Sequence, residues 1–376
     1  MEYRSMERLE ERPSLLGFGC MRLPTVPDSN GVVDEAKTKE MIGRAIDAGV
    51  TYFDTAYPYH SGQSEKVLGR VMKNWDRKQY LLATKLPLWL IKSRDDVERV
   101  FAEQLERLQT DYVDFYLFHG IGKDRWRMIK DLELIPLLEQ YQKQGKIRHL
   151  GFSFHDDYEV FEEVMNARQW DFCQIQLNYM DENFQAGLKG CRLAEKLGVP
   201  IIVMEPVKGG SLATLPEDVA AYFRQQDPSK SIASWAVRWA AGAPAVKVVL
   251  SGMSNMEQVE DNIKTFDSFH PLNEQEQKTV AKVVEAIRAR VKNGCTGCQY
   301  CMPCPFGVDI PRNFAVWNEH AMYQNDRHAR YMYQTVLTEE QRADHCQKCG
   351  ACETKCPQKI SIRADLQRLD QDLKKL

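Results

Sequence analysis

The chain has 376 residues, and its hydrophobic share of 43% is enough to bury the core of one large domain and a smaller second one. Fifty basic residues nearly balance 53 acidic ones, so the formal net charge of -3 argues against a nucleic-acid binder that relies on overall positive charge. No apolar run approaches the about 18 residues of a membrane span and the first residues form no secretory signal, so we expect a cytoplasmic protein without a membrane partner.

Eleven cysteines are distributed unevenly along the chain. Three of them are scattered over the first 290 residues, and the other eight lie between Cys295 and Cys356. Closely spaced cysteines in a chain without a secretory signal are typical of metal ligands, because adjacent thiolates on a tight turn converge on one centre. We therefore predict two domains, residues 1–290 and residues 291–376.

The predicted first domain alternates short apolar runs with longer amphipathic stretches. Eight runs show little period-2 alternation, as expected for parallel strands that are covered on both faces. These runs are Leu15–Gly19, Thr51–Asp54, Tyr80–Lys85, Val113–His119, Ile147–Ser153, Phe172–Leu177, Pro200–Glu205 and Val246–Gly252. Between them, apolar residues recur at three- and four-residue intervals, most clearly at 97–108, 134–141 and 280–287, which predicts helices that bury one face.

Eight strands that alternate with helices over about 290 residues predict a (β/α)8 TIM barrel, an α/β fold. The alternative is a doubly wound open sheet, which normally carries a Gly-x-Gly-x-x-Gly turn after its first strand. The corresponding turn, residues 17–22, reads GFGCMR and lacks the third glycine, which favours the barrel. The second domain has helix-compatible segments at 313–336 and 362–376, so we expect it to be small and mainly α-helical, with ligated metal supplementing its core.

Four titratable side chains are expected at one mouth of the barrel, because active sites of this fold lie at the carboxyl ends of the strands. Asp54, Lys85 and His119 stand at the ends of three consecutive predicted strands, and Tyr59 follows in a loop. Each residue alone is better explained by a structural role. Together they form a site in which Tyr59 protonates a carbonyl oxygen while a hydride reaches the carbon. Lys85 would lower the pKa of this phenol, Asp54 would hold the ammonium, and His119 would orient the substrate oxygen.

The segments around these residues resemble the aldo-keto reductase family. The matching segments are Gly49–Tyr59, Leu82–Lys85, Asp111–His119 and Gly145–Ser153. The resemblance covers residues 13–290 and implies an oxidoreductase that acts on a small-molecule carbonyl or alcohol by hydride transfer, with Tyr59 as general acid/base. The implied catalytic tetrad is Asp54, Tyr59, Lys85 and His119.

The same resemblance implies a site for NADH or NADPH along the later strands. Ser153 and Gln174 match residues that contact the nicotinamide amide, whereas Phe154 and Met204 replace the usual asparagine and stacking aromatic ring. Backbone amides of the loop at 205–212 would cradle the pyrophosphate. The implied cofactor-binding residues are Met21, Ser153, Phe154, Gln174, Met204, Pro206, Lys208, Gly209, Gly210, Gly252, Ser254, Gln258 and Asn262.

The segment at 252–262 matches the adenosine-binding part of the family but contains no lysine or arginine for a 2′-phosphate. NADPH, NADH and another hydride carrier therefore all stay open. The substrate cannot be read from the sequence. Five residues on loops of the catalytic face either line a pocket or pack, and they are Met21, Arg22, Trp89, Trp126 and Tyr179. Of these, Arg22 is the candidate contact for an anionic substrate.

The cysteines of the second domain form two motifs. The second motif, residues 346–357, has the C-x2-C-x2-C-x3-C-P spacing of bacterial ferredoxins, in which the fourth cysteine serves the other 4Fe-4S cluster. The first motif, residues 295–305, is one residue shorter before its last cysteine. Two structural zinc sites are the alternative, but zinc usually takes two well-separated C-x2-C pairs. The resemblance to dicluster α-helical ferredoxins implies a ferredoxin-like domain with Cys295, Cys298, Cys301 and Cys356 on one cluster and Cys304, Cys346, Cys349 and Cys352 on the other.

Three functions are compatible with these features. The leading one is a carbonyl reductase or alcohol dehydrogenase with two 4Fe-4S clusters that serve structure or electron transfer. The second is an electron-transfer oxidoreductase, in which a flavin or nicotinamide in the barrel exchanges electrons with the clusters and an electron-transfer protein is a partner. A flavin is considered because a nicotinamide moves two electrons as hydride, whereas a cluster passes one. The third is a redox sensor with a non-catalytic barrel, which the complete tetrad disfavours.

Overall fold

The computed structural model describes residues 1–376, which form two compact units. The first unit consists of Met1–Lys208 and Ala233–Asn273, and the second of Gly209–Ile232 and Glu274–Leu376. The boundary expected near residue 290 stays a prediction. The second unit includes helices α8 (Glu217–Gln226) and α11 (Glu274–Arg288), which pack against each other.

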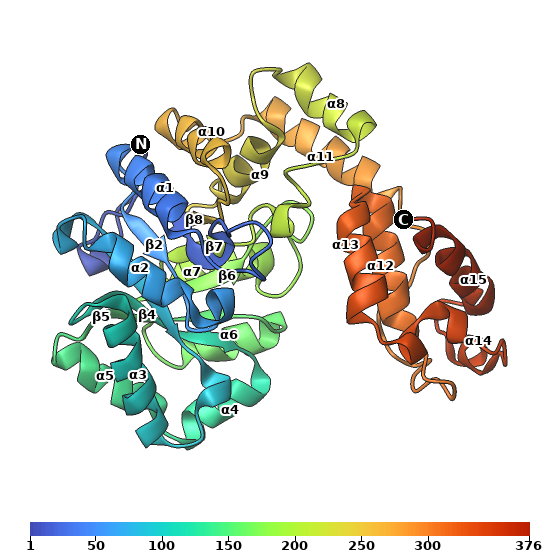
Figure 1. Ribbon diagram of the computed structural model, residues 1–376, viewed down its shortest axis with the longest axis horizontal. Coiled ribbons are helices and arrows are strands. Elements are labelled where there is room, and N and C mark those ends of the chain that lie inside the picture. Colours follow the sequence, from blue (N-terminus) through green and yellow to red (C-terminus); the bar gives the residue numbers. More distant parts are fainter. The chain divides into compact units, whose positions relative to one another are not determined.

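Eight parallel strands close into a barrel in which each strand pairs with its neighbour in the chain and β8 pairs with β1 (Figure 1). The strands are β1 (Leu16–Gly19), β2 (Tyr52–Asp54), β3 (Leu81–Leu86), β4 (Val113–Ile121), β5 (Ile147–Phe154), β6 (Phe172–Gln176), β7 (Ile201–Met204) and β8 (Val246–Ser251). All eight predicted runs form strands, and each observed end lies within two residues of the predicted one. The predicted (β/α)8 TIM barrel is confirmed.

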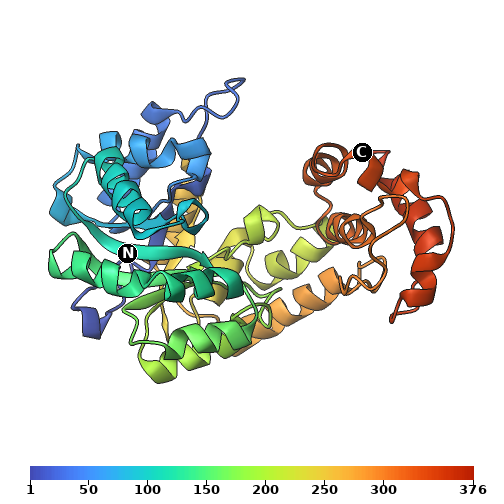
Figure 2. The same cartoon turned by 90° about the horizontal axis from the view of Figure 1, so that it is seen from below.

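Helices of the first unit surround this barrel (Figures 1 and 2). They are α1 (Glu35–Asp47), α2 (Ser64–Met72), α3 (Arg94–Leu108), α4 (Lys123–Asp131), α5 (Leu134–Lys143), α6 (Tyr158–Asn166), α7 (Gly187–Leu197), α9 (Ile232–Ala240) and α10 (Met256–Asp267). Helix α3 shows why these segments are helical: Ser93 and Asp96 form a capping box at its start, and the predicted stripe that includes Val97 and Val100 is buried.

The second unit is mainly α-helical, as predicted. Besides α8 and α11 it contains α12 (Ile310–Tyr323), α13 (Asp326–Tyr331), α14 (Ala351–Lys355) and α15 (Ile362–Leu373). Its own apolar core includes Phe314 of α12 and Leu369 of α15, and six of the eight clustered cysteines pack at the margin of this core. Trp317 donates a hydrogen bond of 3.0 Å to Asp372, which joins α12 to α15.

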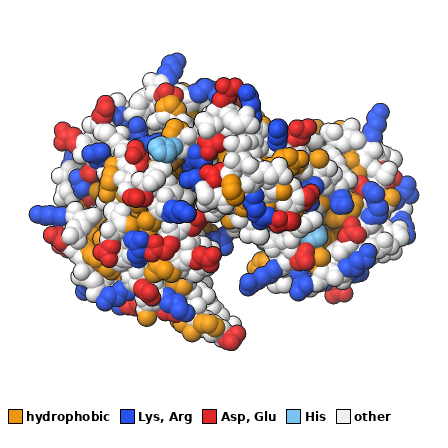
Figure 3. All heavy atoms as spheres, turned by 90° about the horizontal axis from the view of Figure 1, so that it is seen from above, with side chains coloured by type: hydrophobic (Ala, Val, Ile, Leu, Met, Phe, Trp, Pro, Cys, Tyr) orange, Lys and Arg blue, Asp and Glu red, His pale blue; other side chains and the backbone are white.

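The surface agrees with the balanced composition. Acidic and basic side chains are intermixed over the face shown in Figure 3, and neither sign forms a continuous field. None of the helices combines the length and the apolar character that crossing a bilayer requires.

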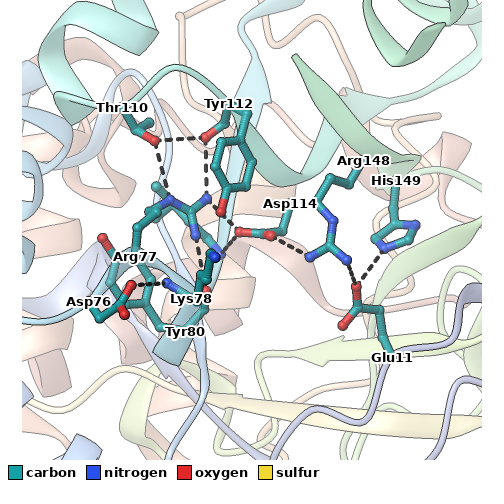
Figure 4. A network of polar contacts seen from close by, with 11 residues as sticks. Glu11, Asp76, Arg77, Lys78, Tyr80, Thr110, Tyr112, Asp114, Arg148 and His149 are labelled. Carbon is teal, nitrogen blue, oxygen red and sulfur yellow. Dashed lines mark hydrogen bonds and ion pairs between the residues drawn. The ribbon is translucent and has the colours of Figure 1, made fainter. Parts of the chain in front are cut away.

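A network of hydrogen bonds and ion pairs joins several segments at the amino-terminal end of the barrel (Figure 4). At its centre is Asp114, which is 1% exposed and lies near the start of β4. This carboxylate accepts hydrogen bonds from Arg77 (2.6 Å), the backbone amide of Leu82 (2.8 Å) and Arg148 (2.8 Å). Arg148 also forms an ion pair with Glu11, which lies in the N-terminal segment before β1. The network therefore connects β3, β4, β5 and that segment.

Replacing Asp114 with asparagine is expected to lower the free energy of unfolding by about 3 kcal/mol, because two guanidinium groups lose their shared buried counter-charge. Denaturant unfolding measures this change. Glu106→Gln on the exposed face of α3, which has no ion-pair partner, is the control and is expected to change stability by under about 0.5 kcal/mol. Equal stabilities for the two variants would mean that the network contributes nothing. Catalysis should not change, because Asp114 lies at the end of the barrel away from the strand carboxyl ends.

Candidate active site

The four residues of the predicted tetrad lie at the carboxyl ends of adjacent strands. Asp54 is the last residue of β2, Lys85 is the next-to-last residue of β3, and His119 lies near the end of β4. Tyr59 begins the short turn Tyr59–Gly62 that follows β2. The parallel barrel therefore brings to one mouth three residues that are separated in sequence by about thirty positions each.

Contacts among these side chains are close. The Lys85 side chain is 1% exposed, and its Nζ donates to Asp54 Oδ1 at 2.6 Å and to the Thr55 carbonyl at 2.8 Å. The same nitrogen lies 5.1 Å from the centroid of the Tyr59 ring. The rings of Tyr59 and His119 meet edge to face, with their centroids 6.2 Å apart. The structure thus brings all four predicted residues together.

The protonation states follow from burial and from the buried ion pair. Burial alone would lower the pKa of Lys85, but the charges of Asp54 and Tyr59 outweigh it and raise that pKa, so the ammonium persists. Burial lowers the pKa of His119 to about 2, and the positive charge of Lys85 adds to this effect. His119 is therefore a neutral imidazole, and its buried Nδ1 has no hydrogen-bond partner.

The pKa of Tyr59 corrects one expectation from the sequence. Lys85 does lower the pKa of this phenol, as expected, but burial raises it by more, and the net pKa lies above the usual value of 10. Asp54 adds to the upward shift. Tyr59 is therefore a protonated phenol at neutral pH, which suits a proton donor.

A buried polar cluster behind Lys85 was missed by the sequence reasoning. Gln104 of α3 donates to Glu65 Oε1 at 2.7 Å and to the carbonyl of Lys85 at 3.0 Å. Thr84, next to Lys85 on β3, also donates to Glu65 Oε1 at 2.7 Å. These contacts fix the backbone that carries Lys85. The available signal was Gln104 itself, a polar residue that stands in the apolar stripe of a predicted helix.

Trp89 and Arg125 border the site beside His119. Trp89 is 44% exposed, and its ring centroid lies 5.1 Å from that of His119. The guanidinium of Arg125 lies 5.5 Å from the Trp89 ring and donates to the carbonyl of Gly120 at 2.8 Å. The sequence reasoning named Trp89 but not Arg125.

Two other pocket candidates from the sequence are buried. Trp126 is 3% exposed and donates to Glu163 at 2.7 Å, so it packs within the helix layer. Tyr179 is 2% exposed, and its ring contacts Trp239. Trp126 and Tyr179 therefore pack in the interior, which was the alternative to lining a substrate pocket.

The residues expected near the nicotinamide lie on three adjacent strands, Ser153 on β5, Gln174 on β6 and Met204 on β7. Gln174 and Met204 lie side by side on β6 and β7, with Gln174 Nε2 3.6 Å from the Met204 sulfur. Gln174 Oε1 is buried and has no hydrogen-bond partner. Ser153 is buried, and its Oγ accepts a hydrogen bond of 2.7 Å from the backbone N–H of Gly120.

Phe154 lies elsewhere. It is fully buried, and its ring contacts Phe161 of α6 at 5.1 Å between centroids, within the core shared by the barrel and its outer helices. The reason is the alternation of side chains along β5, which turns Phe154 away from the face that Ser153 occupies. The expectation that Phe154 binds the cofactor is therefore not supported by its position.

The loop expected to hold the pyrophosphate begins after β7. Lys208 forms an ion pair of 2.6 Å with Asp181, and its backbone N–H donates to the carbonyl of Glu205. Pro206 is buried. Gly209 and Gly210, which belong to the second compact unit, have φ angles of 63° and 104°, a backbone region that favours glycine.

The segment expected to hold the adenosine follows β8, where a Cβ at Gly252 would lie 2.8 Å from Cγ of Arg22. Ser254 donates through Oγ to the Arg22 carbonyl at 2.8 Å, and its backbone N–H donates to Gln258 at 2.7 Å. Asn262 points inward and donates to Ser251. Met21, half exposed, lies on the loop after β1.

A surface hollow lies beside this segment. It is lined by Leu23, Pro24, Thr25, Lys37, Glu40, Met41, Ser254, Asn255 and Met256. Lys37 comes from α1, which the sequence reasoning did not connect with this segment, and it is already paired with Asp34 at 3.1 Å. The hollow therefore contains one lysine and no arginine.

The eight clustered cysteines face two hollows in the second unit. One hollow is lined by Cys301, Cys304, Cys346, Cys349 and Cys352, and the other by Cys295, Cys298, Cys301 and Cys356. None of the eight forms a disulfide. Residues of the two motifs, distant in sequence, thus line the same hollows, and Cys301 borders both.

Comparisons with known proteins agree with this architecture. A sequence model of the Aldo/keto reductase family matches residues 15–285, and one of a 4Fe-4S dicluster domain matches residues 294–361. L-galactose dehydrogenase of Arabidopsis thaliana is 29% identical, with 78% of this chain and 96% of that protein covered. The NADH-specific methylglyoxal reductase of Escherichia coli is 23% identical, with 66% and 89% covered.

A solved structure has the same barrel. The holo form of aldo-keto reductase AKR11C1 from Bacillus halodurans is 26% identical with a TM-score of 0.63, and the match covers 75% of this chain and 96% of that one. Because the family model spans most of the chain, and the barrel it describes is the one observed, this protein belongs to the aldo-keto reductase family and is an oxidoreductase of that type with a 4Fe-4S dicluster domain.

Proposed function

We propose that the barrel interconverts a small-molecule carbonyl compound and its alcohol, with Tyr59 as the general acid/base. The observation that carries this proposal is the convergence of the Tyr59 phenol, the buried Lys85–Asp54 ion pair and the neutral His119 at one mouth of the barrel. The names of two relatives, a dehydrogenase and a methylglyoxal reductase, support a carbonyl or alcohol substrate.

Each side chain has a distinct task in this reaction. Tyr59 donates its proton to the carbonyl oxygen, and the ammonium of Lys85 stabilises the phenolate that remains. Asp54 keeps that ammonium charged and in place through the 2.6 Å contact. His119, being neutral, shares a hydrogen bond with the substrate oxygen without adding a charge that would repel Lys85.

A nicotinamide nucleotide fits the remaining polar groups and, when bound, supplies the hydride. The buried Gln174 Oε1 has no partner in the protein, and a carboxamide N–H is a suitable donor for it. Ser153, Pro206, Lys208 and the segment at Gly252–Asn262 are the further candidate contacts within the first unit. Because the neighbouring hollow offers only one, already paired, lysine, we propose binding of NADH as well as NADPH.

We further propose that the eight cysteines hold two 4Fe-4S clusters with crossed ligation. Cys295, Cys298, Cys301 and Cys356 would hold one cluster, and Cys304, Cys346, Cys349 and Cys352 the other. The two cysteine-lined hollows support this pairing. Zinc usually takes two well-separated C-x2-C pairs, so the run of four closely spaced cysteines in each motif favours a cluster over a mononuclear zinc site.

Electron transfer is the second candidate function. Cys298 and Cys349 are exposed, so each proposed cluster would have one ligand at the surface of the second unit. A cluster at such a position can exchange electrons with a soluble one-electron carrier. A flavin would then be required to divide the electron pair of a hydride, and extraction of cofactors from the purified protein tests whether one is bound.

Anaerobic purification followed by three measurements tests the proposed function. Iron and sulfide analysis with paramagnetic-resonance spectra should report about eight irons per chain in two 4Fe-4S centres. Oxidation of NADH and NADPH should depend on an added aldehyde or ketone. Nucleotide-dependent carbonyl reduction without cluster reduction would favour the simple reductase, and cluster reduction by the alcohol substrate would favour electron transfer. Failure of every carbonyl to stimulate nucleotide oxidation would contradict the reductase assignment.

A further inference from the structure

The site mouth beside His119 has a wall made by two loops. Trp89 lies in the turn Leu88–Leu90 after β3, and Arg125 lies in the first turn of α4 after β4. The Trp89 ring lies 5.1 Å from the His119 ring and 5.5 Å from the Arg125 guanidinium. A single aromatic side chain therefore contacts both the residue that would orient the substrate oxygen and a permanent positive charge.

Arg125 is held in this position by the backbone of the active site. Its Nη1 donates to the carbonyl of Gly120 at 2.8 Å, and Gly120 directly follows His119. The φ angle of Gly120 is 67°, and a Cβ at this position would lie 2.8 Å from Arg125 Nη1. The N–H of Gly120 is in turn bonded to Ser153 Oγ at 2.7 Å. The guanidinium is therefore tied to the segment that carries the catalytic imidazole.

The remaining donors of Arg125 have no anionic partner. Its contacts are the Gly120 carbonyl and the Trp89 ring, and no carboxylate of the protein lies within ion-pair distance. Its charge is felt inside the site, because Arg125 is among the groups that lower the pKa of His119, after burial, Lys85 and His155. Asp54 is neutralised by Lys85.

We propose that Arg125 binds a carboxylate of the substrate, so that the preferred substrates are aldehydes or ketones with a carboxylate about one aromatic ring away from the reacting carbonyl. This inference rests on the proposed carbonyl reduction at Tyr59 and His119. A planar guanidinium with free N–H groups pairs with both oxygens of a carboxylate, and Trp89 supplies an apolar wall for the atoms between the two ends. Arg22, the candidate from the sequence, is not needed for this contact.

A matched pair of substrates tests the proposal. 4-Formylbenzoate and its methyl ester share the reacting aldehyde and the ring and differ in the negative charge. The wild-type holoenzyme should have a kcat/KM at least about tenfold higher for the acid. Arg125→Gln should lower kcat/KM for the acid by about 10- to 100-fold, chiefly through a higher KM. The same substitution should change kcat/KM for the ester by less than twofold. The kcat/KM of Arg125→Lys for the acid should lie between those of the wild type and Arg125→Gln. Lysine keeps the positive charge but cannot pair with both carboxylate oxygens in the planar geometry of a guanidinium.

The control variant is Arg127→Gln, two residues further along α4, where the side chain is exposed and has no ion-pair partner. Residues two apart on a helix do not share a face, so both substrates should keep their wild-type kinetics. Equal losses for acid and ester in Arg125→Gln, or no preference for the acid in the wild type, would overturn the proposal.

A binding measurement separates this inference from the proposed function. Calorimetric titration of the holoenzyme with 4-(hydroxymethyl)benzoate should show at least tenfold weaker binding to Arg125→Gln, and the methyl ester should bind both proteins equally. If neither aldehyde is turned over but this difference in binding is found, carbonyl reduction fails and the carboxylate site stands. If the acid binds both proteins equally, the carboxylate site fails whatever the turnover.

Discussion

Replacing Tyr59 with phenylalanine is expected to lower kcat for carbonyl reduction by roughly 10²- to 10⁴-fold, because the variant loses the phenol that gives its proton to the carbonyl oxygen. The Lys85–Asp54 ion pair is buried and does not depend on the phenol oxygen, so the fold of the site should persist. Steady-state oxidation of NADH or NADPH with a saturating aldehyde measures the loss. Nucleotide affinity, measured by fluorescence titration, should stay within about twofold of the wild type.

Tyr57→Phe is the matched control for this variant. The hydroxyl of Tyr57 donates to Glu103 of α3, on the helix side of the loop, so its removal should leave kcat nearly unchanged. The pH profile gives a second check. Because burial raises the pKa of Tyr59 above 10, reduction should be insensitive to pH at neutral values and fall only as the phenol ionises above pH 10. A Tyr59→Phe enzyme of normal activity would exclude this residue as the acid.

Replacing Cys356 with serine is expected to remove one whole cluster, about half of the bound iron, although this cysteine lies in the second motif. The reason is that Cys356 lines the same hollow as Cys295 and Cys298, whereas Cys346 and Cys349 line the other one. Iron analysis and spin quantification of the reduced protein measure the loss. Cys191→Ala on helix α7, far from both motifs in sequence, should retain all of the iron.

Two double variants distinguish crossed from uncrossed ligation. Under crossed ligation, Cys295→Ser with Cys356→Ser affects a single cluster and leaves the other, whereas Cys346→Ser with Cys356→Ser removes both. Uncrossed ligation gives the opposite pattern, since Cys346 and Cys356 would then share one cluster. Far-UV circular dichroism and barrel activity show whether each variant is folded. A surviving cluster in the second double variant would contradict the proposed pairing.

The sequence alone was sufficient to predict the barrel and its tetrad. Parallel strands covered on both faces must be apolar along their whole length, so the eight strands were visible as continuous runs between amphipathic helices. Because parallel strands end at one edge, Asp54, Lys85 and His119 could be placed at one mouth from their positions at strand ends. The cysteine spacing predicted the second domain for a similar reason, since ligands of one centre lie close together on tight turns.

Other features depended on contacts between segments that the sequence pattern does not connect. Phe154 faces α6 because successive side chains on a strand point to opposite sides. A shift of one residue along β5 would have placed it on the side that Ser153 occupies. Gln104 and Glu65 meet behind Lys85 only because α2 and α3 pack side by side on the barrel. The net pKa of Tyr59 was decided by burial, which outweighs the charge of Lys85 and is a property of the folded site.

Arg125 is the clearest case of a residue that only the tertiary structure could select. In the sequence it is one of several charges at the start of an exposed helix, and nothing in its spacing sets it apart. The fold places it over Trp89, ties it to the carbonyl after His119 and leaves it without a carboxylate partner. Local periodicity determines strands, helices and the residues at their ends, whereas packing between loops determines which charges are satisfied within the protein and which remain free for a ligand.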